Sequence, residues 1–329
     1  MFQYLRQLNS TQQLGALFLL IFGMLLLASV MALVLSLRQH RDPALALAHH
    51  DELHSFEAVL GTSWILALVF WVGWVLGAWV TTLLFGLISF FILREFLTLS
   101  PTRRGDHRSL ILTFFLVLPA QYWLVGTERF NLFSVFIPVF VFLALPAVSA
   151  LANDPLRFLE RNAKLQWGIM VCVFGMSHVP ALLLLDFRNP NHNNELLALF
   201  LVIVVQTCMV VQHVVSRHLI RAPVAPQISL SFNWQSALIG IGVASVFGAL
   251  LAGITPFVPG QAFALSFIAC SAGTLGHLVM KALKRDRGVT NWGAKGRSVT
   301  GAGGLLDRVD ALCFAAPVFF HSVRWYFGL

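Results

Sequence analysis

Charged residues are scarce in this sequence. Lys, Arg, Asp and Glu make up only 11% of its 329 residues, whereas 58% are apolar. A soluble domain carries about a quarter charged residues, because it needs polar side chains to cover its surface. The scarcity of charge also excludes an intrinsically disordered chain, which combines high net charge with few apolar residues. The composition therefore indicates an integral membrane protein.

Cysteine is scarce as well. Cys172, Cys208, Cys270 and Cys313 all lie in apolar runs, and no two of them have CxxC spacing. This pattern excludes a disulfide-rich secreted scaffold and a zinc signature, so we expect four small buried hydrophobic residues. A removable signal peptide is not apparent either, because the apolar run at residues 14–37 is too long for the core of such a peptide.

Long apolar runs are what the sequence has in abundance. Within lipid the backbone must satisfy its own hydrogen bonds, so a spanning segment is a helix of about 20 apolar residues. This criterion predicts an all-α, polytopic membrane protein, a single transmembrane domain over residues 1–329. Its ten predicted helices cover residues 14–37, 62–79, 81–99, 109–126, 132–152, 165–186, 195–215, 235–257, 261–280 and 309–328. We divide the second from the third between Gly77 and Thr82, because one undivided helix would overshoot the bilayer.

The formal net charge of +8 supports this topology. Most Lys and Arg residues fall in alternate loops, and basic loops stay on the cytoplasmic side of a membrane. The pattern predicts that both termini lie outside and that residues 281–308, between the last two helices, face the cytoplasm. We therefore attribute the positive charge to membrane topology and expect no nucleic-acid partner.

The loop at residues 281–308 concentrates residues suited to phosphate chemistry. Lys284 and Arg285 can donate charge-assisted hydrogen bonds to phosphate oxygens. The stretch 301–304 is GAGG, whose backbone N–H groups could approach an anion closely. Asp307 and Asp310 are three residues apart, a spacing that lets two carboxylates share a divalent cation. Together these features indicate phosphoryl or nucleotidyl transfer.

Each feature also has an ordinary explanation when taken alone. Lys284 and Arg285 could be topology determinants, and the glycines could form turns. Asp307 and Arg308 could be a helix-dipole partner and a snorkelling cation. Their concentration in one loop favours the functional interpretation.

The chain also resembles a known family. The run KRDRGVTNWG…GAGGLLDRVD and the ALCFAAPVFFH that follows resemble the C-terminal signature of CDP-diacylglycerol synthases, also called phosphatidate cytidylyltransferases. The segments LREFLTLSPTRRGDHR, PAQYWLV, AKLQWGIMVC and SHVPALL look like a longer-chain branch of that family. On this resemblance, residues 161–329 correspond to the cytidylyltransferase core and residues 1–160 supply the N-terminal helices.

The resemblance implies an enzyme of phospholipid biosynthesis that joins CTP to phosphatidate, giving CDP-diacylglycerol and pyrophosphate. It implies Mg²⁺ as cofactor, a phosphatidate-like membrane lipid and CTP as partners, a homodimer, and a bacterial inner (cytoplasmic) membrane location. The residues it assigns are Asp307, Lys284 and Arg285 for catalysis, Gly301, Gly303, Gly304, Arg308 and Lys281 for substrate binding, and Asp307 with Asp310 for metal binding.

The chain departs from the family pattern at positions that should bind metal. Four positions expected to be acidic are Met209, Gln235, His277 and Asn291, and Lys281 stands where the family has serine. Mg²⁺ prefers anionic oxygen ligands, which none of the four can offer. The charge on the triphosphate would then be poorly neutralised, so the pattern favours a transfer activity that is reduced or lost.

Two alternatives remain. In an active cytidylyltransferase with a rebuilt metal site, Lys281, Lys295 and Arg297 would supply charge in place of metal. In a non-catalytic relative, the pocket would bind anionic lipid or regulate a partner enzyme. A transporter is the least favoured class, because the sequence has no inverted repeat and few charges within its predicted spans.

A few polar residues lie inside the predicted helices. Arg94 and Glu95 lie near the cytoplasmic end of the third one, where charge is costly. We expect a partly paired structural role for them, with a headgroup contact as the alternative. For His178, Gln206 and Gln212 we expect hydrogen bonds between helices.

Overall fold

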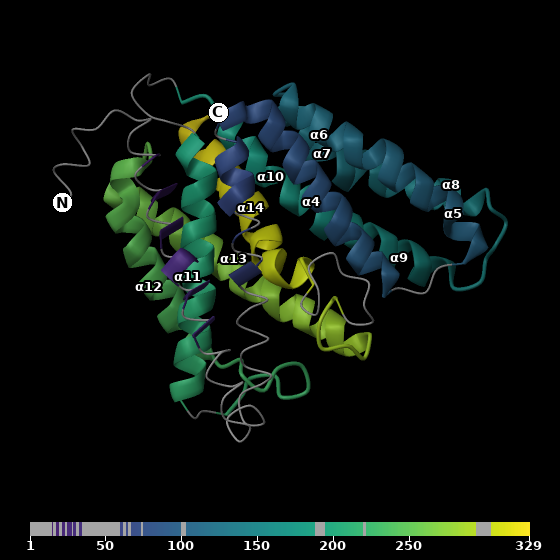
Figure 1. The fold of residues 1–329 in the computed structure, drawn as a ribbon. Coiled ribbons are helices and arrows are strands. Elements are labelled where there is room, and N and C mark those ends of the chain that lie inside the picture. Colours follow the sequence, from purple (N-terminus) through teal and green to yellow (C-terminus); the bar gives the residue numbers. More distant parts are fainter. Residues whose placement is uncertain are drawn as a thin grey trace.

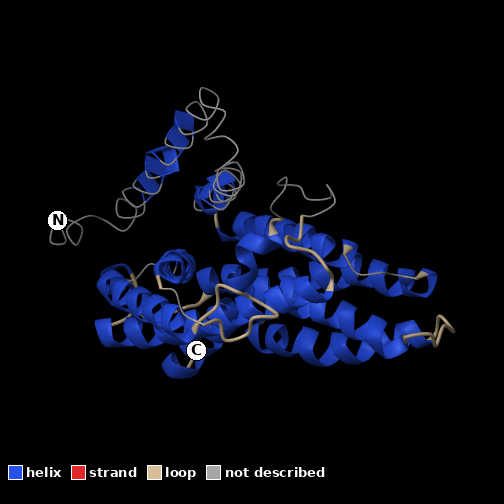
Figure 2. Ribbon diagram, turned by 90° about the horizontal axis from the view of Figure 1, so that it is seen from below, coloured by secondary structure: helices blue, strands red, loops and turns tan. Residues whose placement is uncertain are grey.

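The computed structural model describes residues 77–99, 103–187, 195–219, 222–293 and 304–329, together with scattered positions between residues 15 and 76. The described residues form helices joined by loops, without a β-strand (Figure 1, Figure 2). Seven helical segments are long and apolar enough to cross a membrane, which makes the chain a polytopic helical membrane protein. These segments are Ala78–Thr98, Arg104–Gly126, Phe130–Ala150, Phe158–Leu184, Leu196–His218, Trp234–Ile254 and Pro259–Asp286.

Several of these segments consist of two α-helices joined by a short piece of wider, π-type helix. The joining pieces are Thr113–Val117, Phe136–Val141 and Met170–Gly175. The α-helices are α4 (Ala78–Thr98), α5 (His107–Leu112), α6 (Leu118–Gly126), α7 (Phe130–Val135), α8 (Phe142–Ala150), α9 (Phe158–Ile169), α10 (Met176–Ala181), α11 (Glu195–His218), α12 (Trp234–Leu250), α13 (Pro259–Asp286) and α14 (Leu306–Phe327).

The seven candidate spans agree with the third to ninth predicted spans, and the helix α14 covers the residues of the tenth. The first two, at residues 14–37 and 62–79, fall largely outside the described residues, so a total of ten helices stays a prediction. The predicted division near Gly77 is confirmed: this glycine has a φ of 95°, and α4 begins at the next residue. A positive φ costs glycine little, so the chain can turn there between two helices. The helix α14 carries charged residues near both ends and is not one of the seven candidate spans.

The helix α14 lies among α13, α10 and α4 (Figure 1). Its Leu312, Phe319 and Phe320 are completely buried. Glycines on neighbouring segments let backbones approach it: a Cβ on Gly175 would lie 2.2 Å from the carbonyl oxygen of Cys313. Small residues allow this kind of close packing in membrane proteins, where no hydrophobic effect drives helices together. The packing fixes α14 and, with it, the acidic residues at its start.

One end of the bundle gathers the segments predicted to face the cytoplasm. The end of α13 contacts the segment at 222–233, since Arg285 Nε donates to the carbonyl oxygen of Ile228 at 3.4 Å. The end of α4 contacts the start of α14 through Glu95 and the backbone of Leu306. Four segments distant in sequence thus meet at this end.

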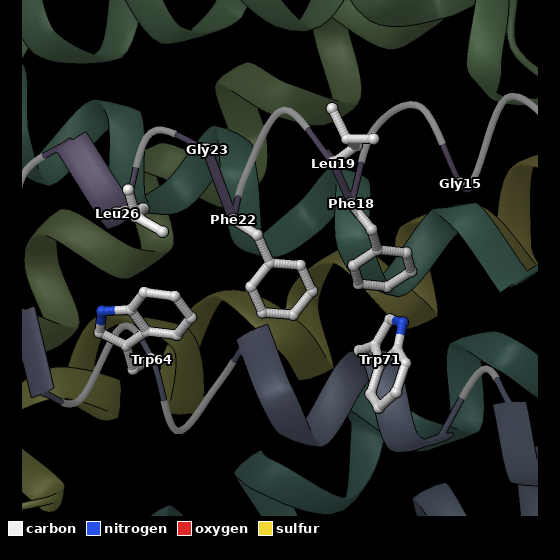
Figure 3. A pocket seen from close by; sticks show the side chains of 8 residues that line it. All are labelled: Gly15, Phe18, Leu19, Phe22, Gly23, Leu26, Trp64 and Trp71. Carbon is white, nitrogen blue, oxygen red and sulfur yellow. The ribbon is translucent and has the colours of Figure 1, made fainter.

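A separate hollow involves positions near the N-terminus (Figure 3). Phe18 and Phe22 point toward Trp64 and Trp71 there, and the ring centroids of Phe22 and Trp64 are 5.7 Å apart. Its lining consists of glycine, leucine and aromatic side chains. A lining without charge does not suit a phosphate ligand, which directs attention to the other end of the chain.

Candidate functional site

The end of α13 positions two basic residues. Gly288 has a φ of 64° and follows the C-cap of α13, where a left-handed residue ends the helix. The N–H of Val289 donates to the carbonyl oxygen of Lys284 at 3.0 Å, which closes the last turn. Lys284 and Arg285 therefore lie in that last turn, beside the segment that returns toward α14.

Asp307 is held by two donors. Lys284 Nζ lies 2.6 Å from its Oδ1, and the backbone N–H of Trp292 donates to its Oδ2 at 2.7 Å. The side chains of Lys284 and Asp307 are only 12% and 10% exposed. Burial raises the pKa of Asp307, while the Lys284 ammonium and the N–H of Trp292 oppose that rise. Both carboxylate oxygens are thus occupied by protein donors.

Asp310 pairs with a different residue. His277 Nδ1 lies 2.8 Å from Asp310 Oδ2, and the N–H of Ala311 donates to Oδ1 at 2.6 Å. Asp310 is almost completely buried. The two aspartates lie three residues apart on α14, and each bonds to its own partner on α13. Asp307 bonds to Lys284, and Asp310 bonds to His277.

Glu95 forms a link that the sequence pattern does not reveal. Its Oε1 accepts a hydrogen bond from the N–H of Leu305 at 3.1 Å, and its Oε2 accepts one from the N–H of Leu306 at 2.9 Å. The glutamate is 2% exposed. A carboxylate at this place satisfies orphan donors and complements the helix dipole of α14. The structural role expected for Glu95 is confirmed. The sequence signal for this role was a charged residue within an otherwise apolar run.

Gly304 lies directly against this link. A Cβ at Gly304 would stand 2.7 Å from the backbone nitrogen of Gly293 and 2.9 Å from Glu95 Oε2. The position needs glycine because three segments converge on it. Its predicted partners in an anion cradle, Gly301 and Gly303, lie outside the described residues, as do Lys295 and Arg297. The two N–H groups that follow Gly304 bind the carboxylate of Glu95.

Two more predicted residues, Lys281 and Arg308, lie close to the aspartates. Lys281 interacts electrostatically with Lys284 and with Asp310, and its Nζ makes a long hydrogen bond of 3.4 Å to Ser229 Oγ. Burial lowers the pKa of Arg308, and the nearby Asp307 and Asp310 oppose that shift. The structure therefore brings Lys281, Lys284, Asp307, Arg308 and Asp310 together at one end of the bundle.

The substituted positions provide no anionic oxygen here. Met209 is half-buried on α11, while Gln235 and Asn291 are exposed. Asn233, two residues before Gln235, accepts a hydrogen bond from the N–H of Ser236 at 2.7 Å and so caps α12.

The residues present do not fit a centre with two magnesium ions. Among the described residues no group of three or more His, Cys, Asp or Glu side chains could hold a metal ion. Mg²⁺ prefers carboxylate oxygens and keeps a strict octahedral shell. To bind Asp307, it would have to compete with Lys284 at one carboxylate oxygen or with the N–H of Trp292 at the other.

Hydrogen bonds between helices surround the site and continue away from it. Gln206 Nε2 donates to the carbonyl oxygen of Arg308 at 3.3 Å, and Gln212 Nε2 donates to Thr274 Oγ1 at 2.6 Å. Farther along α14, the Nε2 atoms of His178 and His321 are 3.3 Å apart. The expected interhelical roles of Gln206, Gln212 and His178 are confirmed.

Comparisons with known proteins point in one direction. Residues 57–326 match the cytidylyltransferase family. The uncharacterized protein YnbB of Escherichia coli strain K12 is 33% identical over 249 residues, which is 75% of this chain and 80% of that protein.

Two shorter matches carry a functional name. The phosphatidate cytidylyltransferase of Mycobacterium leprae is 36% identical over 100 residues, 29% of this chain and 30% of that protein. The phosphatidate cytidylyltransferase of Mycobacterium bovis is 34% identical over 94 residues, 27% of this chain and 29% of that protein.

Proposed function

The chain belongs to the cytidylyltransferase family, and from that membership we propose a membrane homologue of phosphatidate cytidylyltransferase whose transfer activity is reduced or lost. The reaction of the resembling enzymes joins CTP to phosphatidate and releases pyrophosphate. Such a transfer requires charge on the phosphates to be neutralised in the transition state.

One observation carries the proposal: the carboxylates that remain in the signature already bond to donors of the protein itself. Asp307 is bonded to Lys284, and Asp310 is bonded to His277. A carboxylate already bonded to a protein donor is a poor metal ligand, because the metal must compete with that donor for its oxygens. Without the metal, the leaving pyrophosphate loses its main source of stabilisation.

The surroundings of this protein are part of the same proposal. We place it in the bacterial cytoplasmic membrane with both termini outside and with the end of α13 facing the cytoplasm. The basic residues of the loops support this orientation. A homodimer is proposed on family resemblance.

The test is a transfer assay on the purified chain in detergent with CTP and phosphatidate. Magnesium, manganese and zinc are supplied in turn, and CDP-diacylglycerol is measured by mass spectrometry. We expect no product above a heat-denatured control. Turnover that is abolished by Asp307→Asn would contradict the proposal.

A restored variant gives the matching positive control. It carries Met209→Asp, Gln235→Glu, His277→Asp and Asn291→Asp together, which returns four carboxylates to the positions where the family has acids. We expect magnesium-dependent turnover to rise in this variant, provided that its circular dichroism matches that of the unmodified chain. The assay on the unmodified chain decides the proposal independently of the variant.

A further inference from the structure

Two histidines face each other across the neighbouring helices α10 and α14 (Figure 1). The Nε2 atoms of His178 and His321 are 3.3 Å apart. Along α14, His321 lies about 21 Å beyond Asp307, at a rise of 1.5 Å per residue. The pair is therefore separate from the residues to which the family resemblance assigns a role.

The hydrogen bond of His178 to the backbone fixes which of its ring nitrogens is free. Its Nδ1 lies 2.6 Å from the carbonyl oxygen of Phe174. A carbonyl oxygen only accepts hydrogen bonds, so Nδ1 carries the proton and Nε2 presents a lone pair toward His321. Histidines that bind metal ions usually donate their second ring N–H to a carbonyl or carboxylate oxygen in this way. His178 is thus in the tautomer that a metal ligand needs.

Aromatic rings hold His178 in this orientation. Its side chain is completely buried. The ring centroids of Phe133 and Phe174 lie 4.6 and 4.5 Å from that of the imidazole, and that of Phe320 lies at 5.1 Å. Rings packed this closely leave the imidazole little freedom to turn, so the direction of its lone pair is set before a ligand binds.

The distances between the two imidazoles match those of a shared metal ion. Zinc binds imidazole nitrogens at about 2.0 Å with tetrahedral angles, which places two such nitrogens about 3.3 Å apart and their ring centres about 5 Å apart. The distances in this protein are 3.3 Å between the Nε2 atoms and 5.1 Å between the ring centroids. A straight N–H···N hydrogen bond of the same length would hold the ring centres about 5.6 Å apart. The two rings are thus inclined to each other, as the ligands of one ion are.

The nearby charge of Arg324 does not occupy the imidazole nitrogens. This residue lies within electrostatic range of His321. Its Nε donates to the carbonyl oxygen of Leu329 at 3.1 Å, and its Nη2 donates to Asn131 Oδ1 at 3.2 Å. The guanidinium therefore does not compete for the lone pairs of the histidines.

His321 also offers a path for an ion to enter. Its side chain is exposed, and the exposed aromatic residues Trp325 and Tyr326 follow it on α14. Tryptophan and tyrosine are enriched where a membrane meets water. Water can therefore reach His321 and complete the coordination of an ion there.

We infer that His178 and His321 bind a zinc ion through their Nε2 atoms, with water in the two remaining tetrahedral positions. Imidazole suits zinc, whereas magnesium and calcium prefer oxygen ligands. Without the metal, His321 Nε2–H donates to the lone pair of His178. When zinc binds, Nε2 of His321 loses this proton to water and Nδ1 takes one up, so both rings stay neutral. The inference concerns a second site and does not rest on the proposed function.

Zinc binding is measured by isothermal titration calorimetry on the full chain in detergent, after removal of metal with EDTA and dialysis. His321→Gln is the test variant, because glutamine can still donate an N–H to His178 but is a poor zinc ligand. We expect it to lose one bound zinc ion per chain, or to bind that ion at least tenfold more weakly. His107→Gln removes another exposed histidine, on α5, and should bind zinc like the unmodified chain. Equal zinc binding by the His321→Gln variant and the unmodified chain would overturn the inference.

Thermal melts locate the ion between α10 and α14. An ion that binds only the folded chain raises its melting temperature by mass action. We expect saturating zinc to raise the melting temperature of the unmodified chain and of the His107→Gln variant by more than that of the His321→Gln variant. Zinc bound at His277 and Asp310 would be retained when His321 is replaced, so it would not imitate this result. An equal rise in all three proteins would contradict the inference, whatever the outcome of the transfer assay.

Discussion

At the scale of single residues, Glu95 helps to position the site although no motif in the surrounding sequence indicates this role. It joins the end of α4 to the start of α14 across a separation of 210 residues. Since its carboxylate accepts two backbone N–H groups, it orders the turn that leads to Asp307. The site therefore depends on a residue outside the C-terminal signature.

Replacing Glu95 measures this link. Glu95→Ala leaves two buried N–H groups without partners, which should lower the free energy of unfolding by about 2–4 kcal/mol. Glu95→Gln keeps one acceptor oxygen and should cost less. Unfolding in increasing dodecyl sulfate provides the measurement, with the exposed neighbour Arg94→Gln as control. Equal stability of the Ala variant and the control would show that the link contributes nothing.

A second residue-level prediction concerns pH. Arg161 lies between Asp106, at 3.1 Å, and Asp154, and its guanidinium lowers the pKa of Asp154. A carboxyl group with a depressed pKa in the folded state stabilises the fold above its unfolded pKa of about 3.9, and this contribution is lost as the pH falls through the folded pKa. Asp154→Asn should therefore melt below the unmodified chain at neutral pH, and the difference should shrink below about pH 4. Thermal melts at several pH values, with Asp186→Asn as control, measure this; a pH-independent difference would argue against the ion pair.

At the scale of elements, close crossings around α14 determine where its start lies. Gly175 approaches the backbone of Cys313, and Gly273 approaches the carbonyl oxygen of Ala311. The sequence predicts the helices themselves well, because apolar runs and the turn at Gly77 are local signals. It does not predict which helices cross, since glycines at crossings look like any other glycine in a run.

A pair of glycine variants tests the crossing. Gly175→Ala places a methyl group 2.2 Å from the carbonyl oxygen of Cys313 and should destabilise the protein by roughly 1–3 kcal/mol through overpacking. Gly242→Ala, on α12, meets no atom within 4 Å and should be neutral or stabilising by up to about 1 kcal/mol. Denaturation in dodecyl sulfate compares them. Equal stabilities of the two variants would show that the close crossing at Gly175 does not control stability.

At the scale of the whole molecule, the sequence predicts the fold class and much of the site. Charge and hydropathy indicate a polytopic membrane protein, and the signature brings Lys284 and Asp307 to attention. The pairing of Asp307 with Lys284 and of Asp310 with His277 depends on how α13 packs against α14, which no local pattern encodes. The same limit applies to Glu95, because its partners lie in a distant segment.

We propose that the protein's own donors keep Asp307 and Asp310 from binding metal ions. Manganese binding to the purified chain, followed by electron paramagnetic resonance, tests that claim most directly. We expect a signal from free manganese only, equal to that of a detergent blank, and measurable binding in the variant with four restored carboxylates. Two tightly bound manganese ions per unmodified chain, displaced by Asp307→Asn, would contradict it.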